Sequence, residues 1–291
     1  MNEPKHRVME GEQEAIAEAS DAVKHFYATY HDTISDKRYH SPFWLRHYVH
    51  HQIYAQFLPF VRPGERVLDA GCGEGILSGL VARRDCEVVG QDISAPNIEA
   101  ATALAAEWGV EATFLRGDVE RLPFPDDTFD VVMSSHVLEH LPDLQAGLAE
   151  LRRVTRDRAL IAMPTCLSPA AWALLGGDTY WTVRRRSLVA TPLGALRTGL
   201  AFLRGREGPN EGYAGNQSVP HIWRFPWVMR RQIRDAGFTI ERFEAGPLVL
   251  PYLSEYLPVF RRFQRALDRG RSLPWLRNLG YGSLAVCRKV D

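Results

Sequence analysis

The sequence has no net charge, no long apolar run and no paired cysteine pattern. Its 291 residues include 35 Lys and Arg against 35 Asp and Glu, so no overall electrostatic field attracts the chain to nucleic acid. A membrane-spanning helix needs roughly 20 consecutive apolar residues. The longest candidate, 187–203, is interrupted by Pro192, Gly194 and Arg197. The four cysteines are scattered without paired spacing, which favours reduced thiols in a cytoplasm.

Other common features are also missing. The first residues do not contain the apolar core of a signal peptide. The chain contains no internal repeat and no low-complexity tract, and no feature sets its oligomeric state. Apolar residues make up 45% of the chain, which is enough to form a globular core. We therefore expect a cytoplasmic globular protein, either one large domain or one domain with appendages.

A glycine-rich turn follows a short apolar run at residues 67–75, which read Val-Leu-Asp-Ala-Gly-Cys-Gly-Glu-Gly. An apolar run that ends near Asp69 and enters such a turn is typical of a strand that meets a ligand at the carboxyl edge of a parallel sheet. Gly71 and Gly73 would let the backbone approach a ligand where a Cβ atom would collide. The spacing is not that of a dinucleotide-binding turn, because Ile76 stands where the third glycine should be.

Strand and helix patterns alternate after residue 65. Such alternation predicts a doubly wound parallel sheet with a ligand across its switch point. Ser94 and Pro96 mark a helix start, and Gly109 marks a helix end. Helices are also expected at 12–30 and 42–61. The other elements predicted are strands at 66–70, 87–92, 111–115, 129–135, 159–163, 238–245 and 281–288, and helices at 75–84, 95–108, 142–155 and 226–236.

Further motifs follow the glycine-rich turn in order. The second strand ends at Asp92, where a carboxylate suits the two hydroxyl donors of a ribose. After it come Gly-Asp-Val at 117–119, Leu-Pro-Phe at 122–124, the strand at 129–135 and His-Val-Leu-Glu-His at 136–140. This series resembles the class I S-adenosylmethionine-dependent methyltransferases, especially the subgroup with VLDxGCGxG and LPFxDxxFDVV motifs. The resemblance is strong from about Arg66 to Pro164.

The resemblance implies an α/β fold with a mostly parallel, doubly wound sheet of seven strands, the Rossmann-like methyltransferase fold. It implies S-adenosyl-L-methionine as the cofactor. In this fold, residues 1–61 would form a helical segment over the cofactor cleft and residues 62–291 the methyltransferase domain. The pattern breaks at about 165–220 and 247–280, which we expect to be cap insertions, because long insertions in compact domains are usually functional or disordered.

The resemblance also implies a role for each site residue. Asp69 would hold the loop, Gly71 and Gly73 would approach the methionine portion, and Ser135 would offer backbone to the amino-acid end. Asp92 would accept from the ribose hydroxyls, Ile93 and Val119 would line the adenine, and Asp118 would accept from its amino group. Arg46 would meet the donor's carboxylate; the alternative is a solvated helix charge.

His136 and His140 are the candidates for a general base, since a neutral imidazole suits that task near pH 7. In ubiquinone-pathway and small-RNA methyltransferases, a Glu-x-x-Glu-His motif at this place binds a divalent metal. Here His136 replaces the first glutamate, so we expect no metal, although two imidazoles and one carboxylate could hold one.

Both cap insertions mix arginine with large apolar residues. Arginine suits phosphate and carboxylate groups, and the apolar residues suit a hydrophobic body. The expected acceptor is therefore a small molecule, in particular an amphipathic or anionic biosynthetic intermediate, methylated on oxygen or nitrogen rather than carbon. One alternative is a lipid-linked or membrane-surface acceptor with peripheral membrane contact. Others are a cofactor-binding module without methyl transfer, and arginines that are merely solvated. No nucleic-acid partner is expected.

Overall fold

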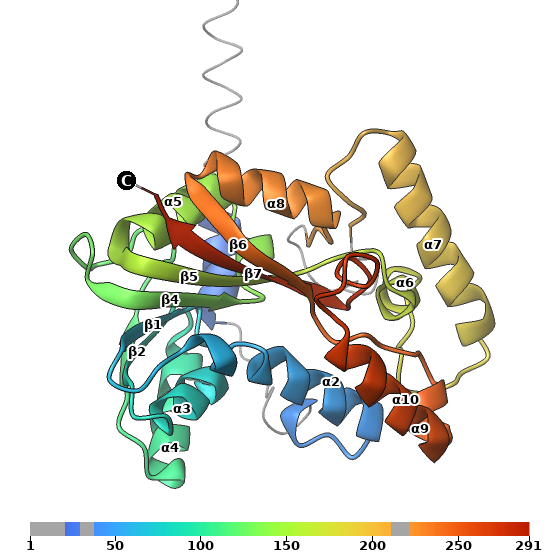
Figure 1. Cartoon of the computed structure of the whole chain (residues 1–291), viewed down its shortest axis with the longest axis horizontal. Helices are drawn as coiled ribbons and strands as arrows, with labels where there is room; N and C mark the ends of the chain where they lie inside the picture. Colours follow the sequence, from blue (N-terminus) through green and yellow to red (C-terminus); the bar gives the residue numbers. More distant parts are fainter. Residues whose placement is uncertain (1–20, 30–37, 211–220, 291) are drawn as a thin grey trace, which may run out of the picture.

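A computed structural model describes residues 21–29, 38–210 and 221–290 of the chain. A seven-stranded sheet lies at its centre, with strand order β3-β2-β1-β4-β5-β7-β6 (Figure 1). β7 runs antiparallel to both of its neighbours, and the other strands pair in parallel. The mostly parallel, doubly wound fold is thus confirmed. The strands are β1 (Arg66–Ala70), β2 (Glu87–Asp92), β3 (Thr113–Arg116), β4 (Phe129–Ser135), β5 (Thr155–Pro164), β6 (Phe238–Ala245) and β7 (Gly282–Lys289).

Helices cover both faces of the sheet because successive strand residues point to opposite sides. Leu68 and Val132 pack with α5 (Leu144–Val154) and α8 (Pro226–Asp235). Their neighbours Val67 and Val131 pack on the other face, with α3 (Ile76–Ala82). α4 (Ala95–Trp108) contacts β2 and β3. Burial on both faces explains why these strands read as nearly continuous apolar runs.

Most predicted elements have the expected bounds, with small differences at the ends. β1, β2, β4 and β6 begin and end where the sequence predicted. β5 is longer than expected, and the predicted helix 42–61 is α2 (Trp44–Ala55) followed by the 3-10 turn η2 (Leu58–Phe60). Ser94 caps α4 by accepting from Asn97 N at 3.3 Å, and Gly109 ends it with φ +63°. Of the predicted helix 12–30, residues 21–29 are helical, whereas 12–20 and Tyr30 lie outside the described residues.

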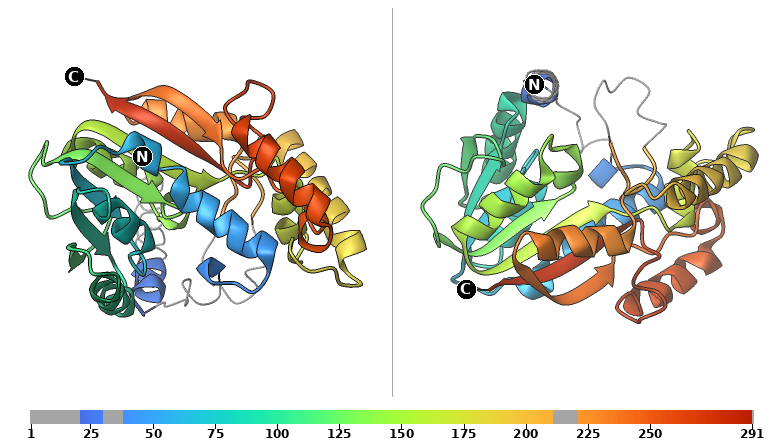
Figure 2. Two further views of the ribbon diagram at one scale, coloured as in Figure 1. Left: turned by 60° about the horizontal axis from the view of Figure 1, so that its bottom comes forward. Right: turned by 90° about the horizontal axis from the view of Figure 1, so that it is seen from above.

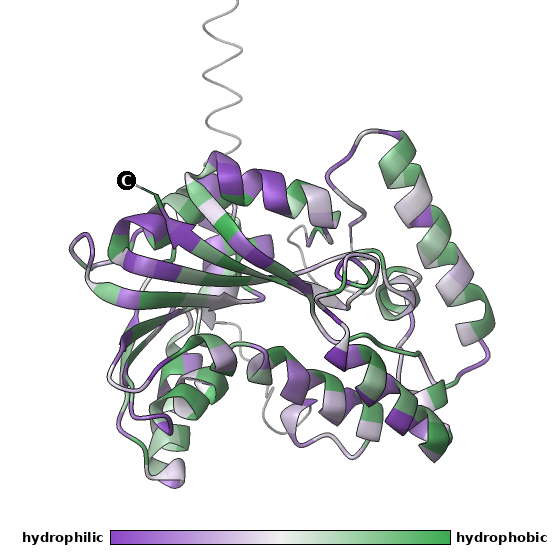
Figure 3. Ribbon diagram, viewed as in Figure 1, coloured by the Kyte–Doolittle hydropathy of each residue, from purple (hydrophilic) through white to green (hydrophobic). Residues whose placement is uncertain are grey.

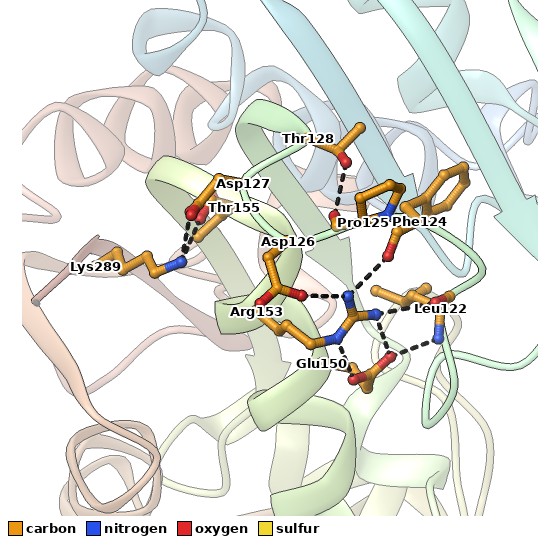
Figure 4. A network of polar contacts seen from close by, with 10 residues as sticks. All are labelled: Leu122, Phe124, Pro125, Asp126, Asp127, Thr128, Glu150, Arg153, Thr155 and Lys289. Atoms are coloured by element: carbon orange, nitrogen blue, oxygen red, sulfur yellow. Dashed lines mark hydrogen bonds and ion pairs between the residues drawn. The ribbon is translucent and has the colours of Figure 1, made fainter.

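An arginine on α5 holds the loop that leads into β4 (Figure 4). Arg153 donates to the backbone carbonyls of Phe124 at 2.7 Å and Leu122 at 3.0 Å. It also pairs with the carboxylates of Asp126 and Glu150 at 2.9 and 2.7 Å. Glu150 in turn accepts from Leu122 N at 2.7 Å. Arg153 therefore clamps the loop that contains the Leu-Pro-Phe motif and fixes it before β4, whose end lines the site.

The two cap insertions contain helices. The first forms α6 (Pro169–Leu175) and α7 (Ser187–Leu203), and the second α9 (Leu253–Tyr256) and α10 (Pro258–Arg269). Residues 211–220 of the first insertion lie outside the described residues. All four helices lie at the end of the molecule away from β3 and α4 (Figures 1 and 2). Among the described residues, no helix combines the length and apolar character needed to span a membrane.

Candidate functional site

A cavity of about 1010 Å³ opens where β1, β2 and β4 end. Its lining comes from the helical residues 21–29, from α2, from the loops after these strands and from the first cap insertion. Carboxyl ends of parallel strands are the usual ligand edge of such a sheet. The structure brings together on this lining all the site residues named from the sequence: Arg46, Asp69, Gly71, Gly73, Asp92, Ile93, Asp118, Val119, Ser135, His136 and His140.

The glycine-rich turn crosses the floor of the cavity in a left-handed backbone conformation. Gly71 has φ +80° and Gly73 has φ +52°, so both positions favour glycine. At Gly71 an added Cβ would lie 2.3 Å from Val137 Cγ2, which means that protein packing, rather than a ligand, requires the glycine here. At Gly73 no described heavy atom lies within 4 Å of an added Cβ. Only Gly73 therefore leaves room for a ligand beside the backbone.

Two carboxylates flank this turn: Asp69 is buried and Asp92 is partly buried. Asp69 accepts from Ser78 Oγ at 2.7 Å, and burial raises its pKa to about 6. Asp92 accepts from Gly73 N and Ser94 N, both at 2.9 Å. Burial also raises the pKa of Asp92, although these hydrogen bonds oppose the shift. Asp92 thus ties the glycine-rich turn to the start of α4 while facing the cavity.

Asp118 meets a partner that the sequence did not indicate. Lys24 belongs to the helical residues 21–29. Its Nζ lies 2.7 Å from Asp118 Oδ2 and 2.5 Å from Glu120 Oε2. Asp118 Oδ1 accepts from Glu120 N at 2.9 Å. Val119 is buried in the core behind it. Lys24 thus anchors the helical residues 21–29 beside the cavity, whose lining they join.

A buried carboxylate, Glu139, lies at the centre of three histidines. Its Oε1 is 3.5 Å from His136 Nδ1, 3.8 Å from His140 Nε2 and 3.9 Å from His221 Nε2. Burial works to raise the pKa of Glu139, but the hydrogen bond from His136 and the charges of the histidines lower it to about 2. His140 Nδ1 forms a 2.8 Å hydrogen bond with Tyr27 OH. Glu139 is therefore ionised and can stabilise an imidazolium beside it.

The same cluster has the geometry of a metal site. Ligand atoms of Glu139, His140 and His221 all lie within 4.8 Å of one another. One carboxylate and two imidazoles suit zinc, iron and related ions. His221 lies more than 80 residues after His140, and no local spacing in the sequence pointed to it. The absence of a metal stays a prediction.

Aromatic side chains of Tyr180, Trp181, Trp223 and Tyr281 form another part of the cavity lining. Tyr281 lies 5.4 Å from Tyr180 and 5.3 Å from Trp223 between ring centroids. The Arg46 guanidinium stacks 4.4 Å above the Trp181 ring. The sequence did not single out these four aromatic residues as part of one site, because they lie far apart in the chain. A flat or hydrophobic group fits this part of the cavity.

Ser135 closes the lining at the end of β4. Its Oγ is buried and has no hydrogen-bond partner among the described residues. A buried hydroxyl without a partner costs free energy unless a ligand or water binds to it.

Comparison with known proteins gives a consistent result. A family model described as a methyltransferase domain matches residues 68–163. A malonyl-[acyl-carrier protein] O-methyltransferase of Serratia marcescens is 35% identical over 144 residues, which cover 49% of this chain and 54% of the relative. A ubiquinone biosynthesis O-methyltransferase of Mesorhizobium japonicum is 34% identical over 141 residues, which cover 45% of this chain and 56% of the relative. The chain spans about half the length of these curated relatives.

The fold also matches a solved structure. The S-adenosylmethionine dependent methyltransferase from Mesorhizobium loti has a TM-score of 0.54 and 19% identity. The match covers 82% of this chain and 98% of that one. The common architecture therefore extends well beyond residues 68–163.

Proposed function

We propose that this chain, a member of the class I S-adenosylmethionine-dependent methyltransferases, transfers a methyl group. The acceptor atom would be an oxygen or nitrogen of a small molecule. The observation that carries the proposal is the cavity at the carboxyl edge of the sheet. Its lining joins the glycine-rich turn, the carboxylates of Asp69 and Asp92, and the histidine cluster. The named relatives are O-methyltransferases, which favours oxygen.

The residues present fit S-adenosylmethionine. The open space beside Gly73 leaves room for the ligand, and Ser135 lies on the same cavity lining. Asp92 would hold the ribose hydroxyls, and Asp118 with Val119 and Ile93 would hold the adenine. Asp69 would fix the turn and contribute negative charge near the cationic ligand. This assignment follows the family pattern residue by residue.

Catalysis would depend on positioning and on one proton transfer. When bound, S-adenosylmethionine supplies an electrophilic methyl group on a sulfonium. The cavity would orient the acceptor oxygen or nitrogen in line with it, which lowers the entropic part of the barrier. His140 would take the acceptor's proton, with its ring held by Tyr27 at 2.8 Å. The ionised Glu139 would stabilise the resulting imidazolium, as the carboxylate does in other histidine-carboxylate pairs. His136, in contact with the same carboxylate, is the second candidate base.

The acceptor would bind in the aromatic part of the cavity, under the cap insertions. Tyr180, Trp181, Trp223 and Tyr281 would contact its apolar body, and Arg184 at the lining would meet an anionic group. An amphipathic or anionic biosynthetic intermediate matches this combination. The division into an N-terminal segment, 1–61, and a methyltransferase domain, 62–291, is part of the same proposal, because Lys24 and Tyr27 contribute to the cavity lining.

A cofactor-binding module without methyl transfer is the second candidate. Calorimetry with S-adenosylmethionine, its demethylated product and NAD tests the binding common to both candidates. We expect micromolar affinity for the first two ligands, in the usual range for enzyme substrates. Binding of NAD alone would contradict both candidates.

Transfer of a labelled methyl group to small molecules of a cell extract then separates the two. Parent protein should label an extractable product, and His140→Ala should bind the cofactor normally but label far less, since a general base contributes about 10²–10⁴-fold. Binding without any labelled product would favour the module.

A further inference from the structure

The long cap helix α7 presents its large apolar residues to solvent. Its buried positions are all small: Ser187, Ala190, Gly194, Thr198 and Ala201. They allow close packing on α6, where an added Cβ at Gly194 would lie 1.9 Å from Trp172 O. On the outer side, Leu188 is 83% exposed and Val189 is 66% exposed. The helix is thus apolar where a surface helix is normally polar.

The second cap insertion also combines buried polar side chains with exposed apolar ones. α10 buries the polar side chains of Gln264 and Asp268, and Gln264 Oε1 accepts from Ser254 Oγ at 2.7 Å. Val259 at its start is 70% exposed. Leu253 and Leu257 in and beside α9 are also exposed. Both insertions therefore leave large apolar side chains exposed to solvent.

The two insertions form one continuous surface. Val183 N, just before α7, donates to Tyr256 OH of α9 at 3.2 Å. Tyr252 OH donates to Thr179 O at 2.9 Å. Figures 1 and 2 show α7, α9 and α10 at the same end of the molecule, and Figure 3 shows much more apolar colour on α7 than on α8. We define the docking face as Leu188, Val189, Leu253, Tyr256, Leu257 and Val259, all exposed.

The two insertions carry an excess of basic residues. Residues 165–220 contain six arginines and three acids, of which Asp178 is buried and pairs with Arg184 and Arg186. Residues 247–280 contain six arginines and two acids: Glu255 accepts from Leu45 N at 2.7 Å, and the buried Asp268 accepts from Leu248 N at 2.7 Å. The whole chain is neutral, so this basic excess is concentrated here. A second copy of this chain would bring like charges together, whereas an anionic surface would complement them.

We propose that the docking face binds an anionic lipid bilayer peripherally. Exposed leucines and valines beside arginines are the pattern by which helices lie in a membrane interface. Arginines near such a surface attract acidic headgroups, and their apolar neighbours insert among the acyl chains. Arg184 lies both in this basic segment and on the cavity lining, so the bilayer would lie beside the cavity. On the proposed function, the acceptor is then an amphiphile that enters from the membrane.

Sedimentation with lipid vesicles tests the docking. We compare vesicles of phosphatidylcholine alone with vesicles that also contain phosphatidylglycerol. The parent should bind the anionic vesicles, bind neutral ones far more weakly, and be released by salt. Replacing Arg185, Arg262 and Arg269, exposed arginines of the two insertions, with alanine should weaken binding by about fivefold for each arginine removed. The control replaces Arg62, Arg84 and Arg121, exposed arginines outside the insertions, and should bind like the parent.

A second variant tests the apolar part of the docking face. Leu188→Asp with Val189→Asp should abolish vesicle binding while leaving the melting temperature nearly unchanged, because both side chains are exposed. Calorimetry with S-adenosylmethionine on the same samples separates this proposal from the methyltransferase assignment: cofactor affinity should be the same in all variants.

Three results would overturn the proposal. The first is equal sedimentation with neutral and anionic vesicles, or none with either. The second is parent-like vesicle binding by both cap variants. The third is concentration-dependent self-association that the Leu188 and Val189 substitutions abolish, which would assign the face to a second copy instead.

Discussion

Asp92→Asn should weaken cofactor binding more than it lowers the stability of the fold. The carboxylate accepts from Gly73 N and Ser94 N, and from Asn97 Nδ2 at 3.3 Å. Asparagine keeps the size but offers one acceptor oxygen, so one buried donor loses its partner, at a cost of about 1–3 kcal/mol. Burial of the charge already opposes the native carboxylate, as its raised pKa shows. The neutral asparagine side chain avoids the cost of burying a charge. The net loss in the free energy of unfolding should therefore be about 1 kcal/mol, at the lower end of this range.

The effect on cofactor affinity should be larger. A charged acceptor for the ribose hydroxyls is lost, which costs about 1–3 kcal/mol and raises the Kd roughly 5–150-fold. Calorimetry with S-adenosylmethionine measures the Kd, and thermal unfolding measures the stability. Asp235→Asn, an exposed carboxylate on α8, is the matched control and should change neither. A Kd for Asp92→Asn equal to that of the parent would refute this assignment of the ribose site.

Three further predictions follow from the same geometry. Gly73→Val should raise the cofactor Kd at least tenfold by calorimetry, on the order of 1.4 kcal/mol, because the side chain enters the ligand space and φ is +52°; parent-like binding would contradict it. Arg153→Ala should lower the free energy of unfolding by roughly 2–3 kcal/mol in urea, whereas Arg156→Ala, an exposed pair, should lower it by less than about 1 kcal/mol; equal losses would show that the clamp is unimportant. Glu139 has a folded-state pKa below its ordinary value, so its stabilising contribution is present above about pH 4.5 and is lost as the pH falls toward 2. Glu139→Gln should therefore melt lower than the parent at pH 6 and approach it near pH 3, and a difference independent of pH would be inconsistent with an ionised Glu139.

Elements that depend on local sequence were predictable. β1 and β2 are short apolar runs with clear turn residues on both sides, so their ends could be read directly. α4 has a side-chain cap at Ser94 and a left-handed glycine at its end, both of which are local signals. That residues at the strand ends share one cavity lining was predictable for the same reason, because parallel strands bring their carboxyl ends to one edge, whereas their roles stay predictions.

Contacts between distant segments could not be read in this way. His221 reaches Glu139 from the far side of the first insertion, and Lys24 reaches Asp118 from the N-terminal segment. Neither residue has a neighbour in the sequence that marks its partner. The exposure of the large apolar residues of α7 could not be predicted either, because the composition of the helix does not show which side packs on α6. Tertiary packing decides these positions, and periodicity alone does not.

Transfer of a deuterated methyl group is the most direct test of the account. The purified chain, S-adenosylmethionine labelled on its methyl group and a lipid-containing small-molecule extract are incubated, and the products are analysed by mass spectrometry. We predict a product that carries the label, appears only with both chain and donor, and is greatly reduced with His140→Ala. Tight cofactor binding with no labelled product in any fraction would contradict the central claim that this cavity is a methyltransferase site.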